Sequence, residues 1–456
     1  MIKNHDELHE ECGVVAIWGD DNAAQLTYYG LHSLQHRGQE AAGIVVRNKS
    51  RKLNIHKGEG LVSEVFNKEK IEKLSGNAAI GHVRYSTAGG GGIMNVQPFL
   101  FRTLDGMMGI AHNGNIVNAN LLKKELEENG SIFNSTSDTE VLGHLIKRET
   151  GRFVDRICKS LEKIDGAFAF VILVEDALYV ARDRYGLRPL SMGRLPSGGY
   201  MFSSETCALD IAGAEYVRDV EPGEIIRVKD GIIKSKKYTE TLPICNKLCA
   251  MEYIYFSRPD SNLDGINVHT ARKTCGKTLF EEAPVEADLV IGVPDSSISA
   301  AIGYSEASGI PYEMGLIKNK YVGRTFIQPT QEMRERGVRM KLSAVSSIVK
   351  GKRVIMIDDS IVRGTTSKRI VKLLKEAGAT EVHVRIASPA IKFPCFYGVD
   401  TSTKDQLIGA RMSVEELREY ICADSLRFMT EEEMKEATHG VGLCLACFNG
   451  EYCTKL

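Results

Sequence analysis

The first half of the chain alternates between short apolar runs and breaks that contain glycine or polar residues. Runs of this length, separated by turn residues, predict strands of an antiparallel sheet. Two segments with helical spacing interrupt them, so the pattern favours a mixed α+β domain. Ser137 and Glu140 give the second helix the spacing of a capping box. The apolar runs are GVVAIWG at 13–19, AAIGHVRYST at 78–87, MMGIAHNGN at 107–115, FAFVILVED at 168–176 and ALYVARDR at 177–184, and the helical segments lie at 118–130 and 137–149.

The second half has nearly continuous apolar strands that alternate with helical segments. The run ADLVIGVP at 287–294 precedes one helical segment, and KRVIMIDD at 352–359 leads into another at 367–379. The latter places Ile370, Val371 and Leu374 on one face, and a further strand-like run, EVHVRIAS, follows it. Strand–helix–strand order with apolar strands predicts an α/β domain with a mainly parallel sheet.

A length of 456 residues supports two domains of ordinary size. We expect the boundary within the polar run KSKKYTETLP, which gives domains at 12–240 and 241–456. Lys and Arg (58) nearly balance Asp and Glu (59), which argues against nucleic acid or a membrane surface as a partner. No apolar stretch reaches the ~18 residues of a membrane span. Because the start, MIKNHDELHEE, is polar and unlike a secretory signal, we expect a cytoplasmic protein.

An acidic pair, Asp358 and Asp359, stands at the carboxyl end of a predicted buried strand, where open α/β sheets bind their ligands. Small residues follow at the start of the next helix, where backbone N–H groups and the helix dipole favour a phosphate. The two carboxylates then suit ribose hydroxyls or a Mg²⁺ ion. The candidate phosphate loop consists of Arg363, Gly364, Thr365, Thr366 and Ser367.

A second loop, GVPDSSISAA at 292–301, has the same strand-to-helix form. Its Asp295 suits the pyrophosphate side of a phosphorylated substrate, and Ser296 suits the Mg²⁺ ion that Asp358 and Asp359 would share. The segment between the two loops, 318–343, is dense in Lys and Arg. It is either a solvated stretch or a basic lid over the substrate, and we favour the lid. The candidate phosphate contacts of this lid are Arg324 and Lys341.

Cys12 opens an apolar run, and a cysteine in such a place is more often part of a core than a nucleophile. Other segments supply complementary functions. Arg84 offers a bidentate fork for a carboxylate, and Asn113 and Gly114 offer the paired donors of an oxyanion hole. Asp138 offers a partner for an ammonium group. An α-amino acid with a side-chain amide needs all of these groups together, so these residues predict such an amino acid as the substrate.

Two family resemblances follow from these segments. CGV, LQHRGQEAAGI, GHVRYST, AHNGN and SDTE, in this order, resemble the glutamine amidotransferases with an N-terminal nucleophile. This implies an αββα glutaminase domain and removal of residues 1–11 as a propeptide, since the α-amino group of Cys12 must relay the thiol proton. The run VIMIDDSIVRGTT resembles the phosphoribosyl pyrophosphate (PRPP) motif of type I phosphoribosyltransferases. This implies that Asp358 and Asp359 bind the ribose hydroxyls and Mg²⁺ and that 363–367 surround the 5′-phosphate.

Joined in this order, the two halves resemble the amidophosphoribosyltransferase family from Cys12 to the C-terminal cysteines. The resemblance implies that glutamine, PRPP and water give 5-phosphoribosylamine, glutamate and pyrophosphate, the first committed step of de novo purine biosynthesis. Ammonia released at Cys12 would attack C1 of PRPP as pyrophosphate leaves. The family is a homotetramer inhibited by purine nucleotides, and no residue of this sequence identifies either property.

The chain contains eleven cysteines, and Cys444 and Cys447 form a C-x-x-C pair. By itself the pair is compatible with zinc, a redox couple or an iron–sulfur cluster. The branch of the family with a leader peptide implies one structural [4Fe–4S] cluster on Cys249, Cys395, Cys444 and Cys447. A tetrathiolate zinc site is the alternative, and by spacing alone Cys245 fits the ligand set as well as Cys249 does. Outside this set, Cys453 is a neighbour, and Cys158, Cys207, Cys275 and Cys422 are expected to be inert.

Two other hypotheses about the function fit the sequence less well. A regulatory protein that senses nucleotides with a PRPP fold would need a DNA-binding element and a basic face, and neither is evident. It would also give no role to Cys12 or Asn113. A hexosamine-forming or asparagine-forming amidotransferase would need a different second half, and the loop at 354–366 fits neither. We therefore expect an enzyme that transfers nitrogen to a phosphoribosyl group.

Overall fold

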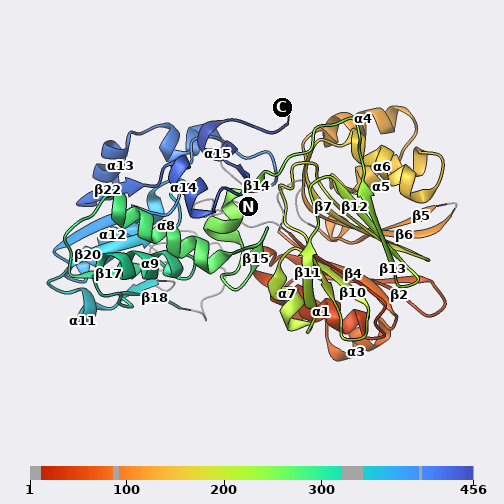
Figure 1. The fold of residues 1–456 in the computed structure, drawn as a ribbon, viewed down its shortest axis with the longest axis horizontal. Helices are drawn as coiled ribbons and strands as arrows, with labels where there is room; N and C mark the ends of the chain where they lie inside the picture. Colours follow the sequence, from red (N-terminus) through yellow and green to blue (C-terminus); the bar gives the residue numbers. More distant parts are fainter. Residues whose placement is uncertain (1–11, 86–91, 104, 320–341, 400–402, 455–456) are drawn as a thin grey trace.

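The computed structural model describes residues 12–85, 92–103, 105–319, 342–399 and 403–454. Figure 1 shows two bodies side by side, the first half of the sequence in red to light green and the second in green to blue. The first contains the antiparallel sheets and the second the parallel sheet. Strands of the antiparallel sheets end at Lys237, and the next strand begins at Leu248. The expected boundary at 240/241 stays a prediction.

The first half consists of two stacked antiparallel sheets. A seven-stranded sheet has the order β11-β9-β10-β1-β4-β2-β3, and a six-stranded sheet has the order β13-β12-β8-β7-β6-β5. The strands of the first sheet are β1 (Gly13–Trp18), β2 (Ala41–Arg47), β3 (Leu53–Glu59), β4 (Ala78–Arg84), β9 (Ser191–Arg194), β10 (Tyr200–Ser203) and β11 (Glu215–Asp219). Those of the second are β5 (Phe99–Thr103), β6 (Gly106–Ile116), β7 (Gly166–Val174), β8 (Leu178–Arg182), β12 (Glu224–Lys229) and β13 (Ile232–Lys237).

Alternation along the strands produces three apolar layers in this half. Val14 and Ala16 of β1 face Ala169 and Val171 of β7 in the core between the sheets, because successive side chains point to opposite faces. Val15 and Ile17 face the other way, and helices on that side cover them. Further helices cover the outer face of the six-stranded sheet, so the layers are αββα, as predicted. The helical elements are α1 (Ala23–Ser33), η1 (Gln35–Arg37), α2 (Val62–Val65), α3 (Lys68–Lys73), η2 (Ile93–Asn95), α4 (Ala119–Glu128), α5 (Thr139–Arg148), α6 (Phe153–Lys163) and α7 (Thr206–Ile211).

The second half is built on a parallel sheet with the order β17-β20-β21-β22. Along β20, Val354 and Met356 face one helical layer while Ile355 and Ile357 face the other. Burial of both faces explains why the sequence shows continuous apolar runs here. The larger elements are α8 (Val268–Glu282), β17 (Leu289–Gly292), α9 (Ile298–Ser308), β20 (Arg353–Asp358), α12 (Thr365–Glu376), β21 (Glu381–Ile386), α13 (Val414–Ile421), β22 (Ser425–Phe428) and α14 (Glu431–Ala437).

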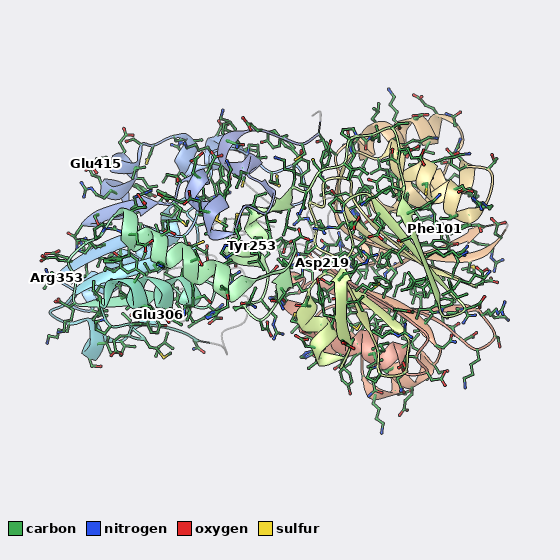
Figure 2. The ribbon with its side chains drawn as sticks, in the orientation of Figure 1. Phe101, Asp219, Tyr253, Glu306, Arg353 and Glu415 are labelled. Carbon is green, nitrogen blue, oxygen red and sulfur yellow. The ribbon has the colours of Figure 1, made fainter. Side chains whose placement is uncertain are left out.

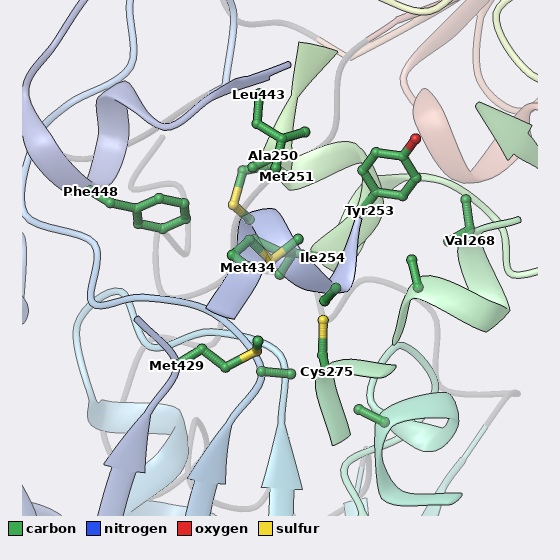
Figure 3. Close-up of a cluster of buried hydrophobic side chains, with 14 of the residues drawn as sticks. Ala250, Met251, Tyr253, Ile254, Val268, Cys275, Met429, Met434, Leu443 and Phe448 are labelled. Carbon is green, nitrogen blue, oxygen red and sulfur yellow. The ribbon is translucent and has the colours of Figure 1, made fainter. Parts of the chain in front are cut away.

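Short elements complete the second half and pack beside its core. In the cluster of Figure 3, Ala250, Met251 and Tyr253 contact residues that lie far along the chain, among them Met434 and Leu443. The segment after 248 therefore belongs to the core of the second half. The short elements are β14 (Leu248–Cys249), the π-helix η3 (Glu252–Phe256), β15 (Asn262–Leu263), β16 (Ile266–Asn267), β18 (Leu316–Lys318), β19 (Leu342–Ala344), α11 (Ser346–Val349), η4 (Lys404–Gln406), η5 (Ile408–Ala410), β23 (Leu443–Cys444) and α15 (Ala446–Asn449).

The predicted helices at 118–130 and 137–149 are present as α4 and α5, and α12 buries Ile370, Val371 and Leu374 as expected. The predicted capping box is wrong. Asp138 precedes α5, and Glu140 instead accepts hydrogen bonds from the N–H groups of Asn134 and Ser135, at 2.9 and 2.8 Å. Among the described residues, no helix is long and apolar enough to cross a membrane.

Candidate functional site

Cys12 lies immediately before β1 and is buried, with 8% of its surface exposed. Strand β1 pairs with β4 on one side and β10 on the other, which places the end of β4 beside the cysteine. The thiol Sγ lies 3.7 Å from the carbonyl oxygen of Tyr85. Burial raises the pKa of the Cys12 thiol to about 11, although a backbone hydrogen bond from Tyr85 and the charge of Arg84 act to lower it. A thiol in this state needs a base before it can attack.

Asn113 and Gly114 lie on β6, in the sheet stacked against β1. The Nδ2 atom of Asn113 donates to Ser204 Oγ at 3.3 Å, and the same hydroxyl accepts from the N–H of Val14 at 3.0 Å. Asn113 is fully buried, and its Oδ1 has no hydrogen-bond partner among the described residues. Gly114 has a φ of 136°, and a Cβ there would meet the carbonyl oxygen of Ala167 at 2.1 Å. Only glycine fits this position.

Asp138 is hydrogen-bonded to β6, the strand that carries Asn113 and Gly114. Its Oδ2 accepts a hydrogen bond from the N–H of Ile116 at 2.8 Å, two residues beyond Gly114. Arg84 and Asp138 both lie close enough to Cys12 for their charges to act on its thiol, Arg84 lowering its pKa and Asp138 raising it. The structure therefore brings Cys12, Arg84 and Asp138 together, and the Ser204 hydroxyl links Asn113 to the backbone of Val14, two residues beyond Cys12.

Sequence reasoning missed two residues of this region. Ser204 links the strand of Cys12 to Asn113, and it lies about 190 residues beyond Cys12 in the chain. Arg37, which is fully buried, donates from Nε to the carbonyl oxygen of Cys12 at 3.3 Å. Arg37 lies in the run LQHRGQEAAGI, and the glycine that follows it, Gly38, is a sequence signal that could have drawn attention to this segment. A Cβ at Gly38 would meet the Arg84 backbone at 2.7 Å, so glycine is needed for this close approach.

The acidic pair of the second half lies where β20 ends. Asp358 is the last residue of β20, and its Oδ1 accepts from Ser297 Oγ at 3.2 Å. Asp359 accepts hydrogen bonds from Ser296 and from Ser360 Oγ, the latter at 2.8 Å. Both predicted loops therefore meet at the carboxyl edge of the sheet. Burial raises the pKa of the Asp359 carboxyl, opposed by the two hydroxyls.

The predicted phosphate loop leads directly into α12. Gly364 precedes the helix with a φ of 77°, in the left-handed region that favours glycine. Thr365 is exposed, Thr366 is half-buried and Ser367 is buried, so the start of the helix is partly open to solvent. Arg363 contacts Gln406, and Asp295 forms an ion pair with Lys318 at 3.3 Å. The two residues predicted to contact phosphate from the lid, Arg324 and Lys341, lie outside the described residues.

Four of the cysteines surround one apolar cavity. Cys249, Cys395, Cys444 and Cys447 line it together with Leu187, Met251 and Ile391, whereas Cys245 is exposed and does not line it. The parallel pairing of β14 with β23 places Cys249 opposite Cys444. Burial raises the pKa of the Cys249, Cys395 and Cys447 thiols, and a hydrogen bond with Cys453 raises that of Cys444.

The donor set of this cavity is suitable for an iron–sulfur cluster. In the described part of the chain, no three His, Cys, Asp or Glu side chains are arranged to hold a single metal ion. The four thiols surround a cavity, however, and the charge of a metal centre would stabilise their thiolates. Of the cysteines expected to be inert, Cys158, Cys207 and Cys275 are buried, whereas Cys422 is exposed.

Two stretches of the chain match family models. Residues 89–210 match the glutamine amidotransferase domain, and residues 270–390 match the phosphoribosyl transferase domain. With the two sites, these matches define the class of the protein: a glutamine amidotransferase joined to a phosphoribosyltransferase.

Relatives of the whole chain specify this class further. The amidophosphoribosyltransferase of Bacillus subtilis is 60% identical and covers 100% of this chain and 97% of its own length. That of Staphylococcus aureus strain Mu50 is 54% identical, covering 98% and 92%. The solved glutamine PRPP amidotransferase from B. subtilis, complexed with ADP and GMP, aligns with a TM-score of 0.92 at 58% identity, covering 97% of this chain and 98% of that one. The chain belongs to the amidophosphoribosyltransferase family. The predicted family and fold class are confirmed, and the residue roles stay predictions.

Proposed function

We propose that this enzyme makes 5-phosphoribosylamine, glutamate and pyrophosphate from glutamine, PRPP and water, as the first committed step of purine synthesis. One observation carries the proposal. Cys12, Arg84 and Asp138 converge in a buried site of one half, and an acidic pair stands beside a phosphate loop in the other. The first arrangement suits an amino acid and the second suits a phosphorylated sugar. We assign the first site to residues 12–240 and the second to 241–456.

In the glutamine site, Arg84 binds the α-carboxylate and Asp138 binds the α-ammonium group. Removal of residues 1–11 gives Cys12 an α-amino group with a pKa of roughly 7.7–8.0, which accepts the thiol proton at neutral pH. The thiolate attacks the side-chain amide, and Asn113 Nδ2 and the Gly114 N–H stabilise the oxyanion. Ammonia leaves, and water releases glutamate from the thioester.

In the PRPP site, Asp358 and Asp359 bind the ribose hydroxyls, and residues 363–367 surround the 5′-phosphate. Oxygen donors from Ser296, Asp358 and Asp359 suit a Mg²⁺ ion, which prefers oxygen ligands and substrate phosphates. Mg²⁺ would neutralise charge on the pyrophosphate leaving group. Asp295 lies on the pyrophosphate side, and Arg324 and Lys341 are assigned to a lid that excludes water.

The four cysteines of the apolar cavity, Cys249, Cys395, Cys444 and Cys447, are assigned to one [4Fe–4S] cluster. Thiols that surround a cavity suit a polynuclear cluster better than one zinc ion, since zinc requires all four sulfurs at about 2.3 Å. The cluster would hold the C-terminal segment to the second half. Measurement of iron, sulfide and zinc in anaerobically purified protein tests the assignment, and zinc without iron would contradict it.

Regulation and assembly are assigned from the family. Because the B. subtilis enzyme was solved with ADP and GMP, purine nucleotides are the expected feedback inhibitors of this chain, and a homotetramer is the expected assembly. Inhibition assays with nucleotides and the mass of the protein in solution test these two assignments.

The function is tested with Cys12→Ser. We expect this variant to lose glutamine-dependent release of pyrophosphate from PRPP while it keeps ammonia-dependent release, because the PRPP site does not use Cys12. Asp358→Asn is the complementary variant and should lose synthesis from either nitrogen source while it still hydrolyses glutamine. Glutamine-dependent synthesis that survives Cys12→Ser would reject Cys12 as the nucleophile.

A further inference from the structure

A group of buried charged residues lies where the two halves of the chain meet. Arg37, Arg188 and Glu205 belong to the first half and Glu252 to the second, and all four side chains have a relative exposure of 0%. Tyr253, the neighbour of Glu252, lies near this junction in Figure 2. Charges are removed from water at such cost that each needs a close partner of opposite sign.

Arg37 is the centre of the group. Its two terminal nitrogens donate to both oxygens of Glu252, at 2.7 and 2.9 Å, which is the bidentate geometry of a strong pair. Nη1 also donates to Glu205 Oε1 at 2.7 Å. The remaining nitrogen, Nε, donates to the carbonyl oxygen of Cys12 at 3.3 Å. Two carboxylates therefore fix a guanidinium that contacts the backbone of Cys12.

Glu252 also connects this guanidinium to the second half. It begins η3, whose residues Tyr253, Ile254 and Phe256 pack in the core of that half. Its Oε1 accepts from Arg188 Nη1 at 3.3 Å, and Arg188 Nη2 donates to the carbonyl oxygen of Tyr397 at 2.8 Å. Arg188 and Tyr397 both line the cysteine cavity. A continuous set of contacts therefore runs from that cavity through Glu252 to Cys12.

Glu252 is ionised in this arrangement. Burial opposes its charge, but the adjacent Arg37 guanidinium outweighs burial and holds the pKa of the Glu252 carboxyl below its usual range. Ser257 Oγ donates a further hydrogen bond to Oε2 at 2.7 Å. The carboxylate is therefore held in one place by three side chains, which makes it a fixed support for Arg37.

We propose that Glu252 is a positioning residue of the glutamine site, through which the second half of the chain fixes Arg37 and thereby the Cys12 main chain. The inference rests on the proposed role of Cys12 as the nucleophile. Once residues 1–11 are removed, Cys12 is held to the chain on one side only. The hydrogen bond from Arg37 to its carbonyl then restrains the residue that carries both the thiol and the α-amino base.

Glu252→Gln tests the proposal, because the amide keeps the shape of the side chain and removes its charge. An amide offers one acceptor oxygen to the guanidinium, so Arg37 loses its bidentate support. We expect kcat for glutamine hydrolysis to fall about 10²-fold, the effect of a small displacement of a reacting group. The KM for glutamine should change little, since Arg84 and Asp138 are intact. Ammonia-dependent synthesis should be largely retained.

Asp264→Asn is the matched control. Asp264 also forms an ion pair across the two halves, with Arg182 at 3.1 Å, and Arg182 has a relative side-chain exposure of 1%. Among the described residues, Asp264 accepts hydrogen bonds from Arg182 and Asn246, and neither of these contacts Cys12. Both variants should lower the thermal unfolding midpoint, but only Glu252→Gln should lower kcat for glutamine hydrolysis selectively. Equal effects of the two variants on the ratio of glutamine-dependent to ammonia-dependent activity would overturn the proposal.

Glu252→Asp provides a second test if Glu252→Gln does not fold. It keeps the charge and withdraws the carboxylate by one methylene, so we expect a smaller loss with the same selectivity. Cys12→Ser, assayed in parallel, separates the two hypotheses. If Cys12→Ser still hydrolyses glutamine, the proposed function fails. If Cys12→Ser is inactive with glutamine while both Glu252 variants hydrolyse it normally, only the role of Glu252 fails.

Discussion

In the first half of the molecule, Cys12 and Asn113 are buried where the stacked antiparallel sheets meet. In the second half Asp358 and Asp359 are also buried, but they lie at the carboxyl end of a parallel sheet, and the phosphate loop that follows them includes an exposed Thr365. The difference extends to the carboxylates. Hydrogen bonds from His144, Ser135 and two backbone N–H groups overcome burial and lower the pKa of Glu140 to about 2, whereas burial raises that of Asp359.

This contrast distinguishes a site formed before its substrate arrives from a site whose substrate completes it. The proposed glutamine site already holds Asn113 and Asp138 in hydrogen bonds to neighbouring residues, so we expect a small change of geometry to reduce kcat. The proposed PRPP site holds two acidic side chains at the carboxyl end of the sheet, so we expect it to gain most from the cation and phosphates of its substrate. The expected effects of substitutions differ accordingly.

The largest effect is expected for Asp359→Asn. Without this carboxylate the developing charge on pyrophosphate is less well neutralised, which we expect to lower synthesis from glutamine and from ammonia by about 10³-fold. Glutamine hydrolysis without synthesis should persist. Pyrophosphate release and glutamate release, measured separately, check this, and equal losses of both would mean that the two sites are not separable.

Asn113→Ala should remove one oxyanion donor and lower kcat for glutamine hydrolysis by about 10²- to 10³-fold. Asn115→Ala is the control, since Asn115 lies on the same strand and donates to the carbonyl oxygen of Phe396 at 2.9 Å instead. Steady-state glutaminase assays compare the two. A larger change in KM than in kcat would indicate that Asn113 binds glutamine rather than the oxyanion.

Gly364→Ala should weaken the phosphate loop. The backbone is left-handed there, and a Cβ would lie 2.8 Å from Ile408 Cδ1, so we expect a loss of about 1–2 kcal/mol in unfolding free energy and a higher KM for PRPP. Gly309→Ala is matched, because its φ is 74° but a Cβ there meets nothing within 4 Å. It should lose comparable stability in urea unfolding without a change in KM.

The smallest effect concerns Glu140, which supports the loop before Asp138. Because its pKa is lowered in the folded protein to about 2, its contribution to stability is present above the unfolded value near 4.5 and is lost as pH falls toward 2. Glu140→Gln should cost about 1 kcal/mol at neutral pH, and the difference from the unsubstituted protein should shrink below pH 4.5. Urea unfolding against pH measures it, with the exposed Glu127→Gln as control.

The sequence predicted those features that depend on local pattern. Strands, helices and the βαβ order follow from hydrophobic periodicity, and Asp358 and Asp359 follow from their position after a buried strand. Contacts set by sheet register were not predictable, and Ser204 reaches Asn113 only because β10 lies beside β1. The predicted capping box is absent because the Glu140 carboxylate accepts hydrogen bonds from backbone N–H groups of the preceding loop instead.

Strand pairing, which local sequence does not reveal, also decides which cysteines line the cavity. Spacing could not separate Cys245 from Cys249, because the two lie one helical turn apart in the sequence. The pairing of β14 with β23 separates them, since it brings Cys249 opposite Cys444. Likewise, the contact of Arg37 with Glu252 joins segments about 215 residues apart, and no local sequence motif predicts such a pair.

The two-residue pairing of β14 with β23 also constrains the order of assembly during translation. Cys249 and Cys444 are about 195 residues apart, which a ribosome traverses in about 10 to 40 s at 5–20 residues per second. Both antiparallel sheets of the first half are synthesised before this interval begins. The cysteine cavity can close only after Cys447 has been made, so the first half of the chain can fold before the cavity forms.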